Sequence, residues 1–302
     1  MPTGPYCTLS DLIRLRFGAR DLRLSRQKKT FSQLVGPHQT RFRGRGVEFE
    51  EVRTYEAGDD VRNIDWRVTA RTGKPHTKLF REERERPVLL LVDQSLSMFF
   101  GSRNCCKSVL AAHTAALLAW AAFQQNDRVG GFVFGGGLHA ETKAKRSVKT
   151  VLRLLNIITE FNRSLERRPP SSGIDINSAL LELRRIIRPG SNIFVLSDFL
   201  GFSEQGEENI FQLARHNDVS AVFICDPLER LLPPAGFYPV TDGSRRTTIF
   251  TGDKRARRQY EERFDNKEKM LRRQLAVKGI PLLRLSTEDA PLTYFRNLLG
   301  TK

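Results

Sequence analysis

Runs of consecutive apolar residues alternate with segments of helical periodicity through the middle of the chain. Residues 88–92 are apolar at every position, as in a strand that is covered on both faces. Strands that alternate with helices in this way predict an α/β fold with a doubly wound, mostly parallel sheet. The expected strands are residues 87–93, 128–134, 138–142, 192–198, 219–225 and 280–285. The expected helices are residues 107–124, 148–161, 177–187, 253–277 and 291–299.

The N-terminal part of the chain has a different pattern. A helical segment over residues 9–17 is followed by polar sequence that mixes short strands with turns. We therefore predict an N-terminal unit over residues 1–86, with this helix and a small β-rich subdomain, and an α/β domain over residues 87–302. Strand-like residues on both sides of Asp242-Gly243 predict a hairpin insert near residues 236–250 in the second domain.

A carboxylate and two hydroxyls follow the first buried strand at a spacing of two residues, as Asp93, Ser95 and Ser97. Asp198 ends a second buried strand. Ligands of open α/β sheets bind at the carboxyl ends of strands, and hard divalent cations prefer oxygen ligands. One interpretation of this group is therefore a Mg²⁺ site. The other interpretation is that both Asp residues cap helices and both Ser residues satisfy backbone groups of the loop.

Two motifs resemble known families. The D-x-S-x-S element of Asp93, Ser95 and Ser97, with Ser197-Asp198 later in the chain, is similar to the metal-ion-dependent adhesion site of von Willebrand factor A domains. The segment RGRGVEFEEVRTYEAGDDVRNIDW, from Arg43 to Trp66, resembles the signature of the DUF58 family, as does the Ala70-Arg71 pair after it. The resemblance covers residues 35 to 230, and so many fixed spacings are hard to meet by chance.

This resemblance implies a von Willebrand A-like (Rossmann-like) fold and a binding module, not an enzyme. In such domains a Mg²⁺ or Mn²⁺ ion bridges to an acidic side chain of the partner. DUF58 proteins are typically encoded beside MoxR-type AAA+ ATPases, so the implied partners are such an ATPase and a client protein. The implied role is a chaperone-like one in the maturation or assembly of protein complexes. The metal ligands that the motif assigns are Asp93, Ser95, Ser97 and Asp198.

One ligand of the family site is missing from this sequence. Ile174 takes the place of the family's threonine in the loop before a helix, and an isoleucine side chain cannot coordinate a metal ion. Asp175 and Ser172 are the neighbours that could substitute for it. Binding of Mg²⁺ or Mn²⁺ is therefore expected at a site that departs from the family pattern.

Motifs of common enzyme classes are absent from the sequence. Position 95 is Ser where haloacid-dehalogenase-type phosphatases carry a second Asp, and no G-x-x-x-x-G-K-[ST] phosphate loop occurs. Neither Ser95 nor Ser97 lies in a G-x-S-x-G nucleophile elbow. The five histidines lack metal-ligand spacing, and His113 lies in an apolar helix as a core residue would. We therefore expect no enzymatic activity.

Acidic and basic residues interleave in the DUF58-like segment. They can pair with one another and order a polar subdomain without a large core, with Trp66 as a packing anchor against the sheet domain. Alternatively, the Arg-rich face of this segment binds the ATPase or a client. The residues expected at that interface are Arg45, Glu48, Arg53, Asp59, Asp60, Arg62, Asp65, Trp66 and Arg71.

The chain carries a large positive charge, because 50 Lys and Arg against 34 Asp and Glu among its 302 residues give +16. Residues 1–86 hold 19 basic and 12 acidic groups (+7), and residues 251–302 hold 13 and 7 (+6), so the excess lies in the flanks. The basic helix over residues 253–277 fits a solvated face of mixed charge, but also an acidic protein surface, anionic lipid or nucleic acid. A nucleic-acid-binding accessory protein is therefore the alternative function.

The sequence shows neither a secretory signal nor an apolar run of membrane-spanning length. The four cysteines, Cys7, Cys105, Cys106 and Cys225, contain no C-x-x-C pair. Unpaired cysteines are typical of a reducing compartment. We therefore expect a soluble, cytoplasmic protein.

Overall fold

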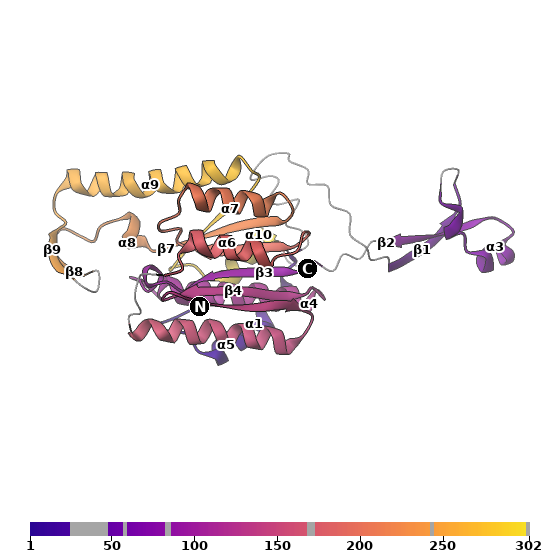
Figure 1. Ribbon diagram of the computed structural model, residues 1–302, viewed down its shortest axis with the longest axis horizontal. Helices are drawn as coiled ribbons and strands as arrows, with labels where there is room; N and C mark the ends of the chain where they lie inside the picture. The colour runs from indigo at the N-terminus through magenta and orange to yellow at the C-terminus, as the bar shows by residue number, and fades with distance from the viewer. Residues whose placement is uncertain (25–47, 57–58, 82–85, 168–172, 242–244, 300–302) are drawn as a thin grey trace. The chain divides into compact units, whose positions relative to one another are not determined.

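The chain forms two compact units in the computed structural model. The larger unit comprises residues 1–39 and 86–302, and the smaller unit comprises residues 40–85. Figure 1 labels their elements. The structure describes residues 1–24, 48–56, 59–81, 86–167, 173–241 and 245–299. Within this part of the chain, no helix is both long enough and apolar enough to cross a membrane.

A six-stranded sheet forms the centre of the larger unit, in the order β10-β7-β6-β3-β4-β5. Its strands are β3 (Val88–Asp93), β4 (Val129–Gly135), β5 (Leu138–Lys145), β6 (Asn192–Ser197), β7 (Asp218–Cys225) and β10 (Leu282–Ser286). Neighbouring strands are parallel except β4 and β5, which a tight turn joins as an antiparallel pair. The predicted α/β fold with a mostly parallel sheet is confirmed.

Helices cover both faces of this sheet (Figure 1). One face carries α1 (Leu9–Gly18), α4 (Lys107–Gln124), α5 (Val148–Ser164) and α10 (Pro291–Leu299). The other face carries α6 (Ile176–Ile186), α7 (Glu204–Ala214) and α9 (Lys254–Ala276). Leu90 and Val92 belong to the core under α4, whereas Leu91 belongs to the core under α6. All three are fully buried, which explains why this strand is apolar at consecutive positions.

Helix α1 packs on α4 and belongs to the larger unit. Leu12 is fully buried, and Nε1 of Trp120 on α4 donates a hydrogen bond to the Leu12 carbonyl oxygen at 3.1 Å. The side chain of Gln125 holds the next segment through the Leu22 carbonyl oxygen and the Leu24 backbone N. The sequence pattern grouped this helix with the β-rich subdomain, and the structure groups it with the α/β unit because its apolar side covers α4.

Helix α7 is an element that the sequence pattern did not predict. Few of its residues are apolar, and Gly206 in its first turn weakens the helical pattern. A Cβ at Gly206 would meet the side-chain oxygen of Asn177 on α6. The glycine therefore allows a close approach of α7 to α6, which the sequence of α7 alone does not reveal.

The smaller unit is a β-hairpin with a helical connection, as its predicted β-rich character requires. Its strands, β1 (Glu48–Thr54) and β2 (His76–Arg81), are antiparallel, and η3 (Val61–Asn63) and α3 (Trp66–Thr72) lie between them in the chain. Asp65 caps α3 by accepting from the backbone N of Arg67 and Val68. Gly73 ends the helix with a φ of 69°, a conformation that glycine adopts without strain.

The predicted hairpin insert is present in the larger unit. Strands β8 (Phe237–Thr241) and β9 (Arg246–Phe250) pair antiparallel, whereas its predicted turn at Asp242 and Gly243 lies outside the described residues. A short helix, α8 (Pro227–Arg230), precedes the hairpin, and α9 follows it. This arrangement places α8 directly after β7, at the same edge of the sheet as the ends of β3 and β6.

Candidate interaction site at the sheet edge

The order of the strands places the candidate site. From β3 the chain runs through α4 to β4 on one side, and it later returns to β6 on the other side. The loops that follow β3 and β6 therefore diverge, and open α/β sheets bind ligands at such switch points. Asp93 is the last residue of β3, and Asp198 directly follows β6. The topology thus brings both predicted carboxylates to one edge.

Both oxygens of the Asp93 carboxylate accept hydrogen bonds from the protein itself. Oδ1 accepts from the backbone N of Ser95 at 2.8 Å, and Oδ2 accepts from Oγ of Ser197 at 2.6 Å. The hydroxyl oxygens of Ser95 and Ser97 lie 3.1 Å apart and are partly exposed, whereas Asp93 is buried. The three side chains predicted at the end of this strand therefore lie together, with the hydroxyls nearest to solvent.

A buried lysine neutralises Asp198. Nζ of Lys107, the first residue of α4, lies 2.7 Å from Oδ2 of Asp198 and 2.5 Å from Oε1 of Glu229. Only 1% of the Lys107 side chain is exposed. The other oxygen of Asp198 accepts from the backbone N of Leu200 at 2.9 Å. One ammonium group thus bridges two carboxylates from different loops.

The start of α8 fixes Glu229. Its Oε2 accepts from the backbone N of Asp226 at 2.9 Å, and Oδ1 of Asp226 accepts from the backbone N of Leu228 at 2.9 Å, which forms a reciprocal capping box. Asp226 also accepts from the hydroxyl of Ser102 in the loop after β3. The ion pair of Glu229 with Lys107 therefore adds a second connection between the loops after β3 and β7.

Burial and charge act differently on the groups of this site. Burial, together with the nearby charge of Asp198, raises the pKa of Asp93 to about 6. Burial acts in the same direction on Asp198, but the Lys107 ammonium outweighs it and lowers the pKa of Asp198 below its ordinary value. Burial opposes the charge of Lys107, yet its two carboxylate partners raise the pKa of Lys107. Lys107 and Asp198 therefore form an ion pair at neutral pH.

The residues at this edge do not make up the full family metal site. Oδ2 of Asp198 is engaged by Lys107. Asp175 caps α6, where its Oδ1 accepts a backbone N–H at 2.9 Å. Ile174 packs against the hydrophobic core, and Ser172 lies outside the described residues. The described residues contain no group of three or more His, Cys, Asp or Glu side chains placed to hold a metal ion. Mg²⁺ or Mn²⁺ binding stays a prediction that this arrangement does not fit.

The hydrogen bonds agree only in part with the alternative interpretation of the motif. Neither Asp93 nor Asp198 is the N-cap of a helix, and the hydroxyl of Ser95 lies against that of Ser97. Asp93 and Asp198 each accept from the backbone N two residues later in the chain. Oγ of Ser197 accepts from the backbone N of Phe199 at 3.0 Å while it donates to Asp93. These side chains thus hold the loops after β3 and β6 in shape.

Sequence reasoning missed Lys107 and Glu229. A signal for Lys107 exists, because it is the only Asp, Glu, Lys or Arg in the apolar segment 107–124. A charged residue on a helix that is buried nearly all round needs a partner of opposite charge. Glu229 has a weaker signal, the D-x-x-E spacing of a capping box with Asp226.

The acidic residues of the DUF58-like segment serve the local structure. Asp59 pairs with Arg53 at 2.8 Å and accepts from the backbone N of Glu56. Asp60 caps η3, and Asp65 caps α3. Of the other predicted interface residues, Arg45 lies outside the described residues, and the structure describes only the backbone of Glu48.

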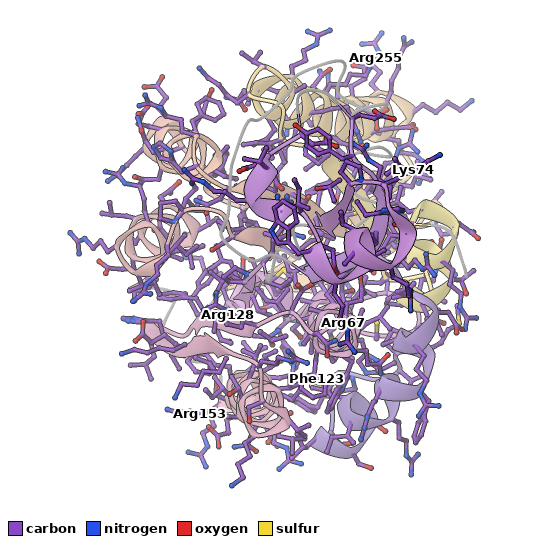
Figure 2. The ribbon with its side chains drawn as sticks, turned by 90° about the vertical axis from the view of Figure 1, so that its right-hand side faces the viewer. Arg67, Lys74, Phe123, Arg128, Arg153 and Arg255 are labelled. Carbon is purple, nitrogen blue, oxygen red and sulfur yellow. The ribbon has the colours of Figure 1, made fainter. Side chains whose placement is uncertain are left out.

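Several basic side chains of this segment, unlike its acidic ones, do not take part in the local structure. Arg62, Arg67, Arg71 and Lys74 are exposed, and their side chains make no hydrogen bond or ion pair with another described residue. Figure 2 labels Arg67 on α3 and Lys74 in the turn after it. Trp66 is 70% exposed, and its packing against the α/β domain stays a prediction. The unit therefore presents an aromatic ring with unpaired positive charges around it.

The outer face of helix α9 is solvent-exposed and carries charges of both signs, as one interpretation of its sequence predicts. Arg258 pairs with Glu262 at 2.9 Å, and Arg272 pairs with Glu268 at 3.0 Å, as the spacing of four residues predicts. The inner side of the helix buries Phe264, Leu271 and Leu275. These two pairs involve two of the nine Lys and Arg residues of the helix, which also holds four Asp and Glu, so α9 keeps an excess of positive charge.

Comparisons with known proteins support the family resemblance. Residues 51–270 match the family described as "Protein of unknown function DUF58". The chain is 31% identical over 229 residues to "Uncharacterized protein Rv1480" of Mycobacterium tuberculosis, a match that covers 76% of this chain and 71% of the relative. The same values hold for "Uncharacterized protein Mb1516" of Mycobacterium bovis.

Solved structures with partial similarity include BatB from Bacteroides thetaiotaomicron, at 16% identity and a TM-score of 0.41, over 71% of this chain and 97% of that chain. The manganese-loaded TRAP protein of Plasmodium vivax is 12% identical with a TM-score of 0.33, over 72% of this chain and 74% of that chain. The fold of this chain is assigned from its own sheet order.

Proposed function

This chain belongs to the DUF58 family, and we propose that it is a non-enzymatic protein-interaction module. Its proposed partners are a MoxR-type AAA+ ATPase and a client protein whose maturation or assembly the two assist. The family signature supports the partnership, and two exposed surfaces support the binding of proteins. The proposed binding does not require Mg²⁺ or Mn²⁺, because the carboxylates of the site are engaged by the protein itself.

The observation that carries this function is the exposure of apolar side chains at the sheet edge. Phe100, Leu138 and Leu200 are 42%, 69% and 62% exposed. They come from the loop after β3, from the start of β5 and from the loop after β6, all at the edge that holds Ser95 and Ser97. Apolar side chains with hydroxyls among them suit a protein surface better than a small charged substrate.

The thiols and the imidazole in the core of the larger unit support a non-catalytic role. Burial raises the pKa of Cys7 to about 11 and that of Cys105 to about 12, so both thiols are protonated at neutral pH. Burial lowers the pKa of His113 to about 4, which keeps its imidazole neutral. These properties are typical of structural residues and unlike those of nucleophiles or general bases.

The smaller unit supports a second contact with an acidic partner. Trp66 and Val61 are exposed beside the unpaired Arg62, Arg67 and Arg71. Tryptophan and arginine are the residues that contribute most at protein interfaces. We expect this surface, residues 61–74, to bind an acidic region of the ATPase or of the client that offers an apolar pocket.

The test is a binding measurement with a purified MoxR-type ATPase from the same organism. Leu200→Asp at the sheet edge and Trp66→Ala on the smaller unit should each weaken binding about tenfold or more, as loss of a central interface side chain does. Val277→Asp and Phe237→Ala are matched controls, because these residues are also exposed but lie elsewhere. Wild-type protein that binds no ATPase, or equal binding by all variants, would contradict the proposal.

The nucleic-acid alternative makes a different prediction in the same assay format. Binding that rests on phosphate contacts loses roughly three to five orders of magnitude of affinity between low and physiological salt when six to ten contacts are made. We expect only weak DNA or RNA binding that is lost at physiological salt. Tight binding of a nucleic acid at physiological salt would favour the alternative.

A further inference from the structure

We infer that the Lys107 ammonium is the built-in cation of the sheet-edge site and that this site works without a divalent metal ion. The ammonium lies 2.7 Å from Asp198 and 2.5 Å from Glu229, and it is almost completely shielded from water. A cation in this position supplies permanently the positive charge that a metal ion supplies in sites with exposed carboxylates.

The carboxylates themselves have no oxygen without a protein partner. Asp198 uses one oxygen for Lys107 and the other for the backbone N of Leu200. Asp93 uses its two oxygens for Ser95 and Ser197. Each of these oxygens keeps a second lone pair. A metal ion bound there would nevertheless lie close to a buried ammonium of the same charge sign, which is unfavourable in a region of low dielectric constant.

A second lysine, Lys267, contacts the backbone of Asp198 from the other face of the sheet. Nζ of Lys267 on α9 donates to the carbonyl oxygen of Asp198 at 3.2 Å. Lys107 and Lys267 therefore place two positive charges beside the end of β6, from α4 and from α9. The second positive charge further disfavours a divalent cation there.

The position of Lys107 is preformed by the backbone. The backbone N of Lys107 donates to the carbonyl oxygen of Phe100 at 2.8 Å, which fixes the loop that leads into α4. A Cβ at Gly101 would meet the carbonyl oxygen of Cys105, so the loop closes tightly at this point. The position of Lys107 is therefore fixed in the folded chain before any partner binds.

The first experiment measures Mn²⁺ binding to the isolated wild-type protein from the electron paramagnetic resonance signal of free Mn²⁺. We expect no loss of this signal on addition of protein, and no change of the melting temperature between millimolar Mg²⁺ and EDTA. Stoichiometric Mn²⁺ binding, or a melting temperature that falls in EDTA, would overturn the inference. Neither result depends on a partner, so the proposed function stands or fails separately.

The second experiment tests whether the charge of Lys107 is what the site needs. Lys107→Met should lower the melting temperature by roughly 6–20 °C, because it leaves the buried carboxylate of Asp198 and the partly exposed one of Glu229 without their counter-charge. The matched control Lys149→Met removes an exposed lysine and should change little. The triple variant Lys107→Met/Asp198→Asn/Glu229→Gln should recover at least half of the loss. Equal stability of Lys107→Met and the control would overturn the inference; if the variants do not fold, the Mn²⁺ measurement decides.

The third experiment rests on the proposed function and measures ATPase binding in Mg²⁺ and in EDTA, with a nucleotide-free ATPase so that EDTA acts on this chain alone. We expect the same affinity within about twofold, a small difference in free energy. Loss of binding in EDTA would overturn metal independence. Absence of binding in both conditions would count against the proposed function and not against the role of Lys107.

Discussion

The pKa values of Asp93 and Asp198 are shifted in opposite directions although each residue is 3% exposed. Asp198 has the Lys107 ammonium 2.7 Å away, and its pKa falls below the ordinary value. Asp93 has only hydroxyl and amide partners, and burial raises its pKa to about 6. A full charge at hydrogen-bond distance therefore outweighs burial in this site, whereas hydroxyl and amide dipoles do not.

A first prediction follows for Asp93→Asn. The ordinary pKa of an aspartate is about 3.9, and that of Asp93 in the folded chain is about 6. The folded state binds the proton more tightly, so the stabilisation is complete below the ordinary pKa and is lost as the pH rises through 6. At pH 7 the wild type bears the cost of a buried charge that Asn does not have. We expect Asp93→Asn to raise the free energy of unfolding by roughly 1–3 kcal/mol at pH 7 and by less near pH 4.5.

Urea denaturation at both pH values measures this difference. Asn keeps an acceptor for the backbone N of Ser95 and can donate to Oγ of Ser197, so the loop geometry is preserved. Glu141→Gln on β5 is the matched control, because Glu141 is exposed. A difference between Asp93→Asn and the wild type that does not change with pH would contradict the assigned pKa.

At the scale of elements, α4 organises the larger unit. It buries an Ala- and Leu-rich surface against the sheet, carries Lys107 at its start and receives α1 on its outer side through Trp120. Neither α1 nor α4 has a strong polar face on the side where they meet. This contact explains why residues 9–18 belong to the α/β unit although residues 19–87, which include the DUF58-like segment, separate them from β3 in the sequence.

A second prediction tests the contact between α1 and α4. Leu12→Ala should lower the free energy of unfolding by about 2–5 kcal/mol, because it removes a fully buried side chain from this contact. Arg14→Ala on the exposed side of the same helix is the matched control. Chemical denaturation measures both variants. Equal stability of the two would show that α1 is not part of the core of the α/β unit.

At the scale of the whole molecule, the chain is divided into a larger unit with an extensive hydrophobic core and a smaller unit of residues 40–85. None of the described residues between 48 and 81 belongs to either hydrophobic core of the larger unit. The smaller unit instead relies on its β1–β2 pairing, on caps such as Asp65 and on the ion pair of Arg53 with Asp59. Its exposed aromatic and basic side chains are those for which we propose a role in binding.

A third prediction concerns a chain in which a short Gly/Ser linker replaces residues 40–85. Its α/β unit should still unfold cooperatively, with a melting temperature within a few degrees of the full chain, because its core is complete without these residues. Calorimetry measures the transition, and the ATPase-binding assay should show a loss comparable to that of Trp66→Ala. A chain that no longer unfolds cooperatively would contradict the division into two units.

Much of the fold could be predicted from the sequence because its signals are local. The apolar run of residues 88–92, and that of residues 219–225 with Ser220 as its single polar residue, predict strands that are buried on both faces, and the structure confirms them. Helix α4 begins and ends at the predicted residues. Helix α7 could not be predicted in this way, since its position depends on the close approach at Gly206, which only the neighbouring α6 explains.

The sequence by itself determined the α/β class, the DUF58 membership and the gathering of Asp93, Ser95 and Ser97 after one strand, because each depends on residues that are near one another in the chain. Only the tertiary structure decided the state of the site. Lys107, Asp198 and Glu229 are far apart in sequence, and the strand order brings them within hydrogen-bond distance. Charge interactions between distant residues depend on distance and burial, and neither quantity can be read from spacing along the chain.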